Sequence, residues 1–419
     1  MNGMRRREVC DVAGDVTVGS IVADTAAMSV ADRSATGTTA PVARDRDGDQ
    51  PATVAPWELP RGQGRSGRPG LLLNVQALRA LAAMMVVLFH ARVINPAGTL
   101  VSLDFGNAGV DIFFFISGFI ITHVTTAADV GRPGRFLLKR AIRVVPLYWA
   151  LTIVLFVAAM FLPFLISGET KPGLVALAKS LFFVPYFDDS GAILPVLFMG
   201  WTLNYEVFFY LVFAASLMIA DAGVRRWTLT GIMTALIVAG ALFRPDDAIG
   251  QTYTDLLMIE FVIGVWMATA YRAWPGLDLG RAARLLWIAV GIAGGVALIW
   301  AEARFPSAAR ELKWGIPAFV IVAAALVLER GGSAIGWKWV ERVGEASYAI
   351  YLSHAFVIRA LAMVYGRLAI TNMAVHVVAM MAAILCATVV GIAFHYLIER
   401  PLVEVARTRL LARSAAIRG

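Results

Sequence analysis

The sequence has few cysteines, few charged residues and none of the short patterns that mark nucleotide or zinc sites. Its two cysteines, Cys10 and Cys386, lie far apart in dissimilar surroundings, so they predict neither a disulfide framework nor a metal-ligand cluster, and they leave the redox compartment open. Zinc spacings, a Walker loop and a dinucleotide fingerprint are absent, so we expect no bound metal and no such nucleotide chemistry. Charged residues make up 16% of the chain, against about 25% in soluble domains.

Long apolar runs take the place of the missing charge. Hydrophobic residues form 59% of the chain, and after residue 70 they gather in runs of about 20 residues, the length needed to cross a hydrocarbon core of ~30 Å. The expected fold is all-α, a polytopic integral membrane protein in the lipid bilayer with about ten transmembrane helices. The predicted spans are 75–94, 106–126, 146–166, 199–220, 227–243, 253–271, 284–301, 314–329, 346–366 and 374–397.

The positive charges give these spans a direction. With both termini in the cytoplasm, eighteen lysines and arginines fall in the inner loops and tail and seven in the outer loops, as the positive-inside rule requires. The net charge of +8 therefore indicates membrane topology and no nucleic-acid partner. The short apolar segment 174–187 is broken by Pro185, and we interpret it as re-entrant or interfacial. If it crossed, every later loop would change sides and the bias would be lost.

The two ends of the chain differ from the middle. Residues 1–70 are rich in Gly, Ala, Asp, Arg, Thr and Pro and poor in aromatics, so we expect a disordered N-terminal extension. A start codon placed too far upstream is the alternative explanation. It has no continuous apolar stretch of the kind that a cleaved signal peptide needs. Residues 403–419 are predicted to form a basic cytoplasmic tail.

Several ionisable residues fall inside predicted spans, where charge is costly and function is the default hypothesis. Arg79 and His90 share the first span. His90 stands eleven positions after Arg79, which places the two within about 20° of one helix face and about 16 Å apart along the axis. This pattern favours a functional pair. The alternative is an arginine that reaches the headgroups and a structurally satisfied histidine.

Three carboxylates fall at the same predicted depth as His90. Asp111, Glu206 and Glu260 all map to the outer half, which indicates a water-accessible chamber where a carboxylate beside an imidazole positions a general base. Structural pairing of these groups is the alternative. Ser117 adds a second polar group to the span of Asp111, whereas Gly106, Gly109 and Gly118 in that span predict close helix packing.

Two further groups are predicted nearer the inner side. Arg140 and Arg143 stand three residues apart and share one helix face, which suits either a phosphate clamp or plain topology determination. Tyr348, Tyr351 and His354 fall near one face in the inner half, where they either line a tunnel or cap the bundle.

Six short elements together resemble those of the acyltransferase-3 family of bacterial membrane O-acyltransferases. The likeness covers about 74–402, and we assign 71–402 to a transmembrane domain of this kind. The elements occur in the family's order: Arg79 and His90 with ten residues between them, Gly-Val-Asp-x-Phe-Phe-x-x-Ser-Gly-Phe (109–119), Arg-x-x-Arg-x-x-Pro (140–146), Trp-Thr-Leu-x-x-Glu (201–206), Ser-Tyr-x-x-Tyr-x-x-His (347–354) and Glu-Arg-Pro (399–401).

The resemblance implies an O-acetyltransferase of the bacterial cytoplasmic membrane. Such an enzyme moves an acyl group, usually acetyl from acetyl-CoA, to a hydroxyl of an exopolysaccharide, a lipopolysaccharide O-antigen or another glycan, in company with polysaccharide assembly proteins. Acyl-CoA is then a co-substrate, and no cofactor is tightly bound. Some family members add an extracytoplasmic hydrolase-like domain. Because this chain ends about twenty residues after Pro401, we expect acyl transfer within the membrane domain or through a separate protein.

The roles expected under this hypothesis are specific. The phosphates of acyl-CoA bind Arg140, Arg143 and Arg79. His90 deprotonates the acceptor hydroxyl or first accepts the acyl group. The remaining predicted residues assist: Glu206 or Asp111 orients His90, and Ser117 or Tyr351 donates to the oxyanion. Two alternatives stay open, namely a macrolide or other small glycosylated metabolite as acceptor, and a secondary transporter, which also has midplane charges and broken helices.

Overall fold

The computed structural model describes residues 71–94, 103–161, 173–274, 276, 278–368, 370 and 372–416. The predicted extension 1–70 lies outside these residues, as does the end of the predicted tail. Across the described residues the structure is helical and contains no strand, which confirms the all-α prediction. The helices are α1 (Leu73–Ala91), α2 (Ala108–Val124), α3 (Pro133–Phe161), α4 (Leu174–Leu181), α5 (Trp201–Ser216), α6 (Ala222–Phe243), α7 (Ala248–Tyr253), α8 (Met258–Ala273), α9 (Arg281–Arg304), α10 (Ile316–Arg330), α11 (Lys338–Glu345), α12 (Ser347–Gly366), α13 (Met373–Phe394) and α14 (Arg400–Ala416).

Nine segments of the described chain are long and apolar enough to cross a membrane. They match nine of the ten predicted spans. The remaining prediction, 199–220, corresponds to α5, which has 16 residues and a length of about 24 Å. The segment 174–187 holds the eight-residue α4, which is too short to cross a ~30 Å core. The protein is therefore a multi-pass membrane protein.

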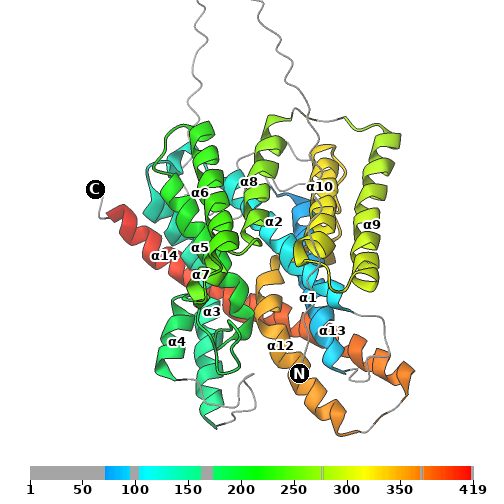
Figure 1. Cartoon of the computed structure of the whole chain (residues 1–419). Coiled ribbons are helices and arrows are strands. Elements are labelled where there is room, and N and C mark those ends of the chain that lie inside the picture. Colours follow the sequence, from blue (N-terminus) through cyan, green and yellow to red (C-terminus); the bar gives the residue numbers. More distant parts are fainter. Residues whose placement is uncertain are drawn as a thin grey trace, which may run out of the picture. The chain divides into compact units, whose positions relative to one another are not determined.

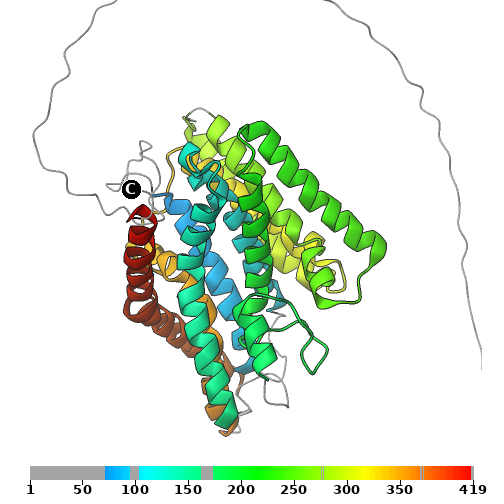
Figure 2. The same cartoon turned by 90° about the vertical axis from the view of Figure 1, so that its left-hand side faces the viewer.

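Two predicted spans are parts of longer helices. The arginine segment before 146 and the span after it form one continuous helix, α3, with Pro146 in its interior. Likewise α13 continues through a π-helical turn, η7 (His395–Glu399), into α14, so that Met373–Arg409 is unbroken. Figure 2 shows α13 and α14 running in different directions, as expected where a π-turn interrupts the regular ladder.

The helices differ in how far the protein covers them. Of the 18-residue apolar stretch in the span that contains α2, 67% is buried inside the protein. In the corresponding stretches of α6 and α9 only 11% is buried. We infer that α2 lies in the interior of the bundle and that α6 and α9 face lipid. In Figure 1, α9 and α10 lie on one side of α2, and α5 and α6 lie on the other.

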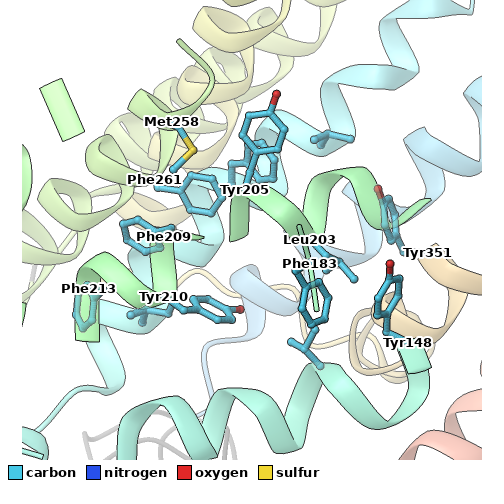
Figure 3. Packing of buried hydrophobic residues seen from close by; sticks show 14 of the residues in the cluster. Tyr148, Phe183, Leu203, Tyr205, Phe209, Tyr210, Phe213, Met258, Phe261 and Tyr351 are labelled. Atoms are coloured by element: carbon cyan, nitrogen blue, oxygen red, sulfur yellow. The ribbon is translucent and has the colours of Figure 1, made fainter. Parts of the chain in front are cut away.

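Close contact between α2 and its neighbours depends on glycine, as predicted. A Cβ on Gly109 would meet the Ala82 carbonyl oxygen of α1, and a Cβ on Gly118 would meet the Phe261 carbonyl oxygen of α8. The aromatic core beside this contact stacks Phe114 on Phe261 at 4.4 Å and Phe209 on Phe261 at 4.8 Å between ring centroids. Figure 3 shows this core around α5.

Candidate active site

A cavity of about 160 Å³ opens between α1, α2, α3, α5 and α12. Six of the eight predicted site residues line it, although they come from five helices that are distant in sequence. Its charged and polar lining consists of Arg79, Ser117, Arg140, Arg143, Thr202, Glu206, Tyr210, Ser347, Tyr348 and Tyr351.

Three guanidinium groups reach the cavity from two helices. The continuous α3 presents Arg140 and Arg143 on one face, and α1 contributes Arg79. Arg79 Nη2 donates to Ser347 Oγ at 2.9 Å. Arg143 Nη1 lies 3.2 Å from one carboxylate oxygen of Glu399. The other oxygen of Glu399 lies 2.7 Å from Nδ1 of His395, the first residue of η7.

Arg140 lies beside an aromatic ring. Its guanidinium lies 5.4 Å from the ring centroid of Phe136, one turn earlier on α3, and its buried Nε has no hydrogen-bond partner in the described part of the chain. The three arginines face two carboxylates, Glu206 in the cavity and the buried Glu399 beside it. One positive charge is therefore in excess. The cavity therefore suits an anion.

Glu206 occupies the cavity side of α5. Its Oε1 accepts hydrogen bonds from Ser117 Oγ at 2.5 Å and from the Tyr210 hydroxyl. Figure 3 shows Tyr210 extending from α5 with its hydroxyl turned away from Phe209 and Phe213. Because Ser117 already donates its proton to Glu206, it must break that bond before it can donate to an oxyanion.

Tyr351 lies at the end of the cavity near the histidines. Its hydroxyl contacts Thr202 Oγ1 at 2.8 Å and the Met199 carbonyl oxygen at 3.1 Å, and its ring centroid is 6.1 Å from that of His354. Figure 3 shows it beside Tyr148 at the far end of this core. Tyr351 thus connects the arginine-lined cavity to the histidine pair.

His90 pairs with His354, which corrects two expectations. His354 Nε2 lies 3.2 Å from His90 Nδ1, and the ring centroids are 4.9 Å apart. Neither Glu206 nor Asp111 bonds to His90 in the described structure, so an imidazole stands where a carboxylate was expected. His354 also lies at the level of His90 and not apart from it, as the predicted inner-half and outer-half placements required.

Helix offsets explain the error in depth. The short helix α11 packs beside the start of α1, where a Cβ on Gly344 would meet the Gln76 carbonyl oxygen. α12 begins only afterwards, with Ser347 beside Arg79 in the second turn of α1. His354 is therefore carried outward to His90.

The predicted four-member chamber is divided into three separate groups. Asp111 is fully buried and accepts from Arg310 Nη2 at 2.6 Å. Glu260 is 2% exposed, and neither of its carboxylate oxygens has a hydrogen-bond partner in the described structure. A Cβ on Gly315 would stand 3.1 Å from Glu260 Oε1 and 3.9 Å from Asp111 Oδ1, so the two carboxylates share one pocket.

The pocket that holds Asp111 and Glu260 also contains Arg310, which was not among the predicted site residues. Arg310 stands in a predicted outer loop, where an arginine has no unusual cost and so gave no signal.

The described residues contain no cluster of three or more histidines, cysteines or carboxylates able to hold a metal ion.

Comparison with known families agrees with this geometry. The sequence model of the acyltransferase-3 family, described as an acyltransferase domain, matches residues 72–399. The chain belongs to the acyltransferase-3 family. It is therefore a membrane O-acyltransferase, which favours the enzyme over the transporter alternative.

Curated relatives have a range of names. The chain is 36% identical to the exopolysaccharide production protein ExoZ of Rhizobium meliloti (strain 1021) over 321 residues, which cover 74% of this chain and 94% of ExoZ. It is 28% identical to the acyltransferase MdmB of Streptomyces mycarofaciens, over 61% of this chain and 68% of MdmB. It is 27% identical to the peptidoglycan O-acetyltransferase OatA of Listeria monocytogenes serovar 1/2a (strain ATCC BAA-679 / EGD-e), over 50% of this chain and 30% of OatA. No solved structure matches significantly.

Proposed function

We propose that this acyltransferase moves an acetyl group from acetyl-CoA, on the cytoplasmic side, to a hydroxyl of an exported or cell-surface polysaccharide. The observation that carries the proposal is the cavity where Arg79, Arg140 and Arg143 converge. Acyl-CoA is an anionic phosphate ester, and guanidinium groups bind phosphate with paired, charge-assisted hydrogen bonds.

The distance between the arginines and His90 suits a long donor. On α1 alone, Arg79 and His90 are separated by about 16 Å along the helix axis. The pantetheine arm of acyl-CoA is a flexible chain that separates the phosphates from the thioester. With the phosphates on the arginines, this arm extends past Tyr351 and brings the thioester carbonyl to His90.

His90 then acts on the acceptor. It takes the proton of the acceptor hydroxyl while that oxygen attacks the thioester carbonyl; the C–S bond breaks, and the departing thiolate takes the proton back from the imidazole. In the variant route His90 first accepts the acyl group and then yields it to the hydroxyl. Both routes end in an O-acyl ester and free CoA.

The acceptor is inferred from the relatives. ExoZ is named for exopolysaccharide production and matches over nearly its whole length, and OatA is named as a peptidoglycan O-acetyltransferase. These names favour a glycan acceptor. The similarity to MdmB keeps a small glycosylated metabolite as the second candidate. The apolar helices support a membrane location. The proposal places the enzyme in the cytoplasmic membrane, where a cytoplasmic acyl-CoA can reach it, with polysaccharide assembly proteins as neighbours.

The test is transfer by the purified protein in proteoliposomes, using radiolabelled acetyl-CoA and chemically de-O-acetylated exopolysaccharide. We expect label in the polysaccharide, and a loss of at least ~10²-fold in His90→Ala, the scale of general base catalysis. His376→Gln is the matched control, because His376 on α13 bonds Tyr365 near the far end of α12, eleven residues after His354. Full transfer by His90→Ala would refute the catalytic role. Label that enters only a small glycoside would favour the second acceptor class.

A further inference from the structure

The structure pairs His90 with a residue to which neither the family match nor the proposed reaction assigns a role. His354 is fully buried on α12, and His90 is partly exposed near the end of α1. The hydrogen bonds around the pair determine which ring nitrogens carry protons, because each backbone oxygen beside them can only accept.

The proton on His354 is placed by its own helix. His354 Nδ1 lies 3.0 Å from the carbonyl oxygen of Ile350, four residues earlier. Since that oxygen accepts, Nδ1 must donate and therefore carries the proton. A neutral imidazole has one N–H, so His354 Nε2 holds a lone pair and acts as an acceptor toward His90.

The proton on His90 follows from the same reasoning. His90 Nδ1 lies 2.9 Å from the Val86 carbonyl oxygen and 3.2 Å from His354 Nε2. Both partners are acceptors, so Nδ1 must carry the proton and share it between them. A doubly protonated His354 would instead require an unprotonated His90 Nδ1, whose lone pair would face the Val86 oxygen. The consistent arrangement leaves His90 Nε2 with a lone pair.

We propose that His354 is a positioning residue that holds His90 in the tautomer whose Nε2 is free to act as the base or nucleophile. When Nε2 takes a proton, the imidazolium of His90 donates through Nδ1 to the neutral His354, which stabilises the charge. A neutral partner also avoids the cost of burying a second charge inside the membrane. This inference deepens the proposed function and rests on it.

Few titratable groups surround His90 in the described part of the chain, so a change in its pH dependence can be traced to His354. Phe89 and Phe198 contribute ring contacts at 4.8 and 5.7 Å between centroids, and neither titrates. The charged or titratable groups nearest to His90 among the described residues are His354 on α12 and Arg92 on the following turn, which pairs with Asp104. Replacing His354 leaves the Arg92–Asp104 pair in place.

The experiment compares two substitutions of one side chain. His354→Gln keeps an acceptor near the position of Nε2, whereas His354→Phe keeps a ring and removes the acceptor. We expect His354→Phe to lower kcat about 10- to 100-fold, the scale of one hydrogen bond to a charged group, with KM for acetyl-CoA unchanged. We also expect the acidic limb of its rate profile to move to lower pH, because His90 becomes less basic. His354→Gln should recover most of the lost rate and restore the limb.

A second measurement is independent of turnover. The chain has five histidines, so nitrogen NMR of histidine-labelled protein in bilayers, assigned with single substitutions, can report the protonation of each His90 nitrogen. We expect Nδ1 protonated and Nε2 bare in the native chain, and a mixture of tautomers in His354→Phe. His376→Gln is the control that leaves both signals and the rate unchanged.

The outcomes separate the two proposals. A native His90 with Nε2 protonated, or equal kinetics for His354→Gln and His354→Phe at every pH, would overturn the role of His354. If the native tautomer is as expected but His90→Ala transfers normally, the proposed function fails while the tautomer assignment stands. Should His354→Phe not fold, the native spectrum and the pH profile of His354→Gln still decide the question.

Discussion

The arginines of the cavity differ in their partners, and this difference determines which one can report on ligand binding. Arg143 pairs with Glu399, and Arg79 donates to Ser347. Removing Arg143 would leave a buried carboxylate without that ion pair, which destabilises a protein by several kcal/mol whatever the ligand. Arg140, with an unpartnered Nε and an aromatic ring beside it, is the guanidinium to replace.

We expect Arg140→Gln to weaken acetyl-CoA binding about 10- to 100-fold, because one charge-assisted hydrogen bond to phosphate is lost. Equilibrium binding of labelled acetyl-CoA to purified protein measures this, with thermal stability recorded alongside. Arg135→Gln, an exposed position on the same helix, is the control that should bind normally. An unchanged Kd in Arg140→Gln would remove this arginine from the phosphate site.

Helix α2 shows how one element positions two groups of side chains. One end carries Asp111 into the pocket shared with Glu260, and six residues later Ser117 meets Glu206 on α5. The backbone contact at Gly118, the residue next to Ser117, holds α2 against α8. The position of α2, and with it the positions of Asp111 and Ser117, therefore depends on Gly118, which is not itself a site residue.

At this scale we expect Gly118→Ala to lower the stability of the purified protein by about 1–3 kcal/mol, the usual cost of overpacking. Its Cβ would meet the Phe261 carbonyl oxygen and stand 2.9 Å from the carbonyl carbon, and backbone atoms cannot rotate away. Gly231→Ala on α6, where a Cβ has open space, should be neutral or stabilising. Thermal unfolding in detergent compares the two, and equal melting temperatures would contradict the packing argument.

On the scale of the whole molecule, the proposed reaction requires a direction across the membrane. Donor phosphates must reach the arginines from the cytoplasm, and this orientation assumes that 174–187 does not cross. The eight residues of α4 agree with that assumption. α5 is a short helix of 16 residues that places the polar side chains of Thr202 and Glu206 in the lining of the cavity.

Cysteine labelling tests this direction. In a chain whose two native cysteines are replaced by serine, we expect Ser190→Cys, in the loop after α4, to react with a membrane-impermeant maleimide on intact cells. Ala334→Cys, in the loop after α10, should react only after permeabilisation. The reverse pattern would place the arginine cavity on the outside and exclude cytoplasmic acyl-CoA as its ligand.

Much of this protein follows from the sequence alone. Nine of the ten spans, the failure of 174–187 to form a crossing helix, the glycine contacts of α2 and the family itself are all visible in local patterns. Local patterns suffice because a bilayer sets the length and polarity of each crossing helix, and because residues three or four apart must share a helix face. The sequence assigned Arg79, Arg140 and Arg143 to one phosphate site, but only the fold shows that the three line one cavity.

Only the tertiary structure decided which charges meet. His90 and His354 are 264 residues apart, and their contact depends on the offset that α11 imposes on α12. Asp111 and Arg310 are 199 residues apart, and Arg310 gave no signal in an outer loop. Predicted depth alone grouped His90 with the carboxylates, because depth specifies one coordinate of a side chain and leaves its position around the bundle open. Helix packing supplies that position, and it gave His90 a neutral imidazole as its partner.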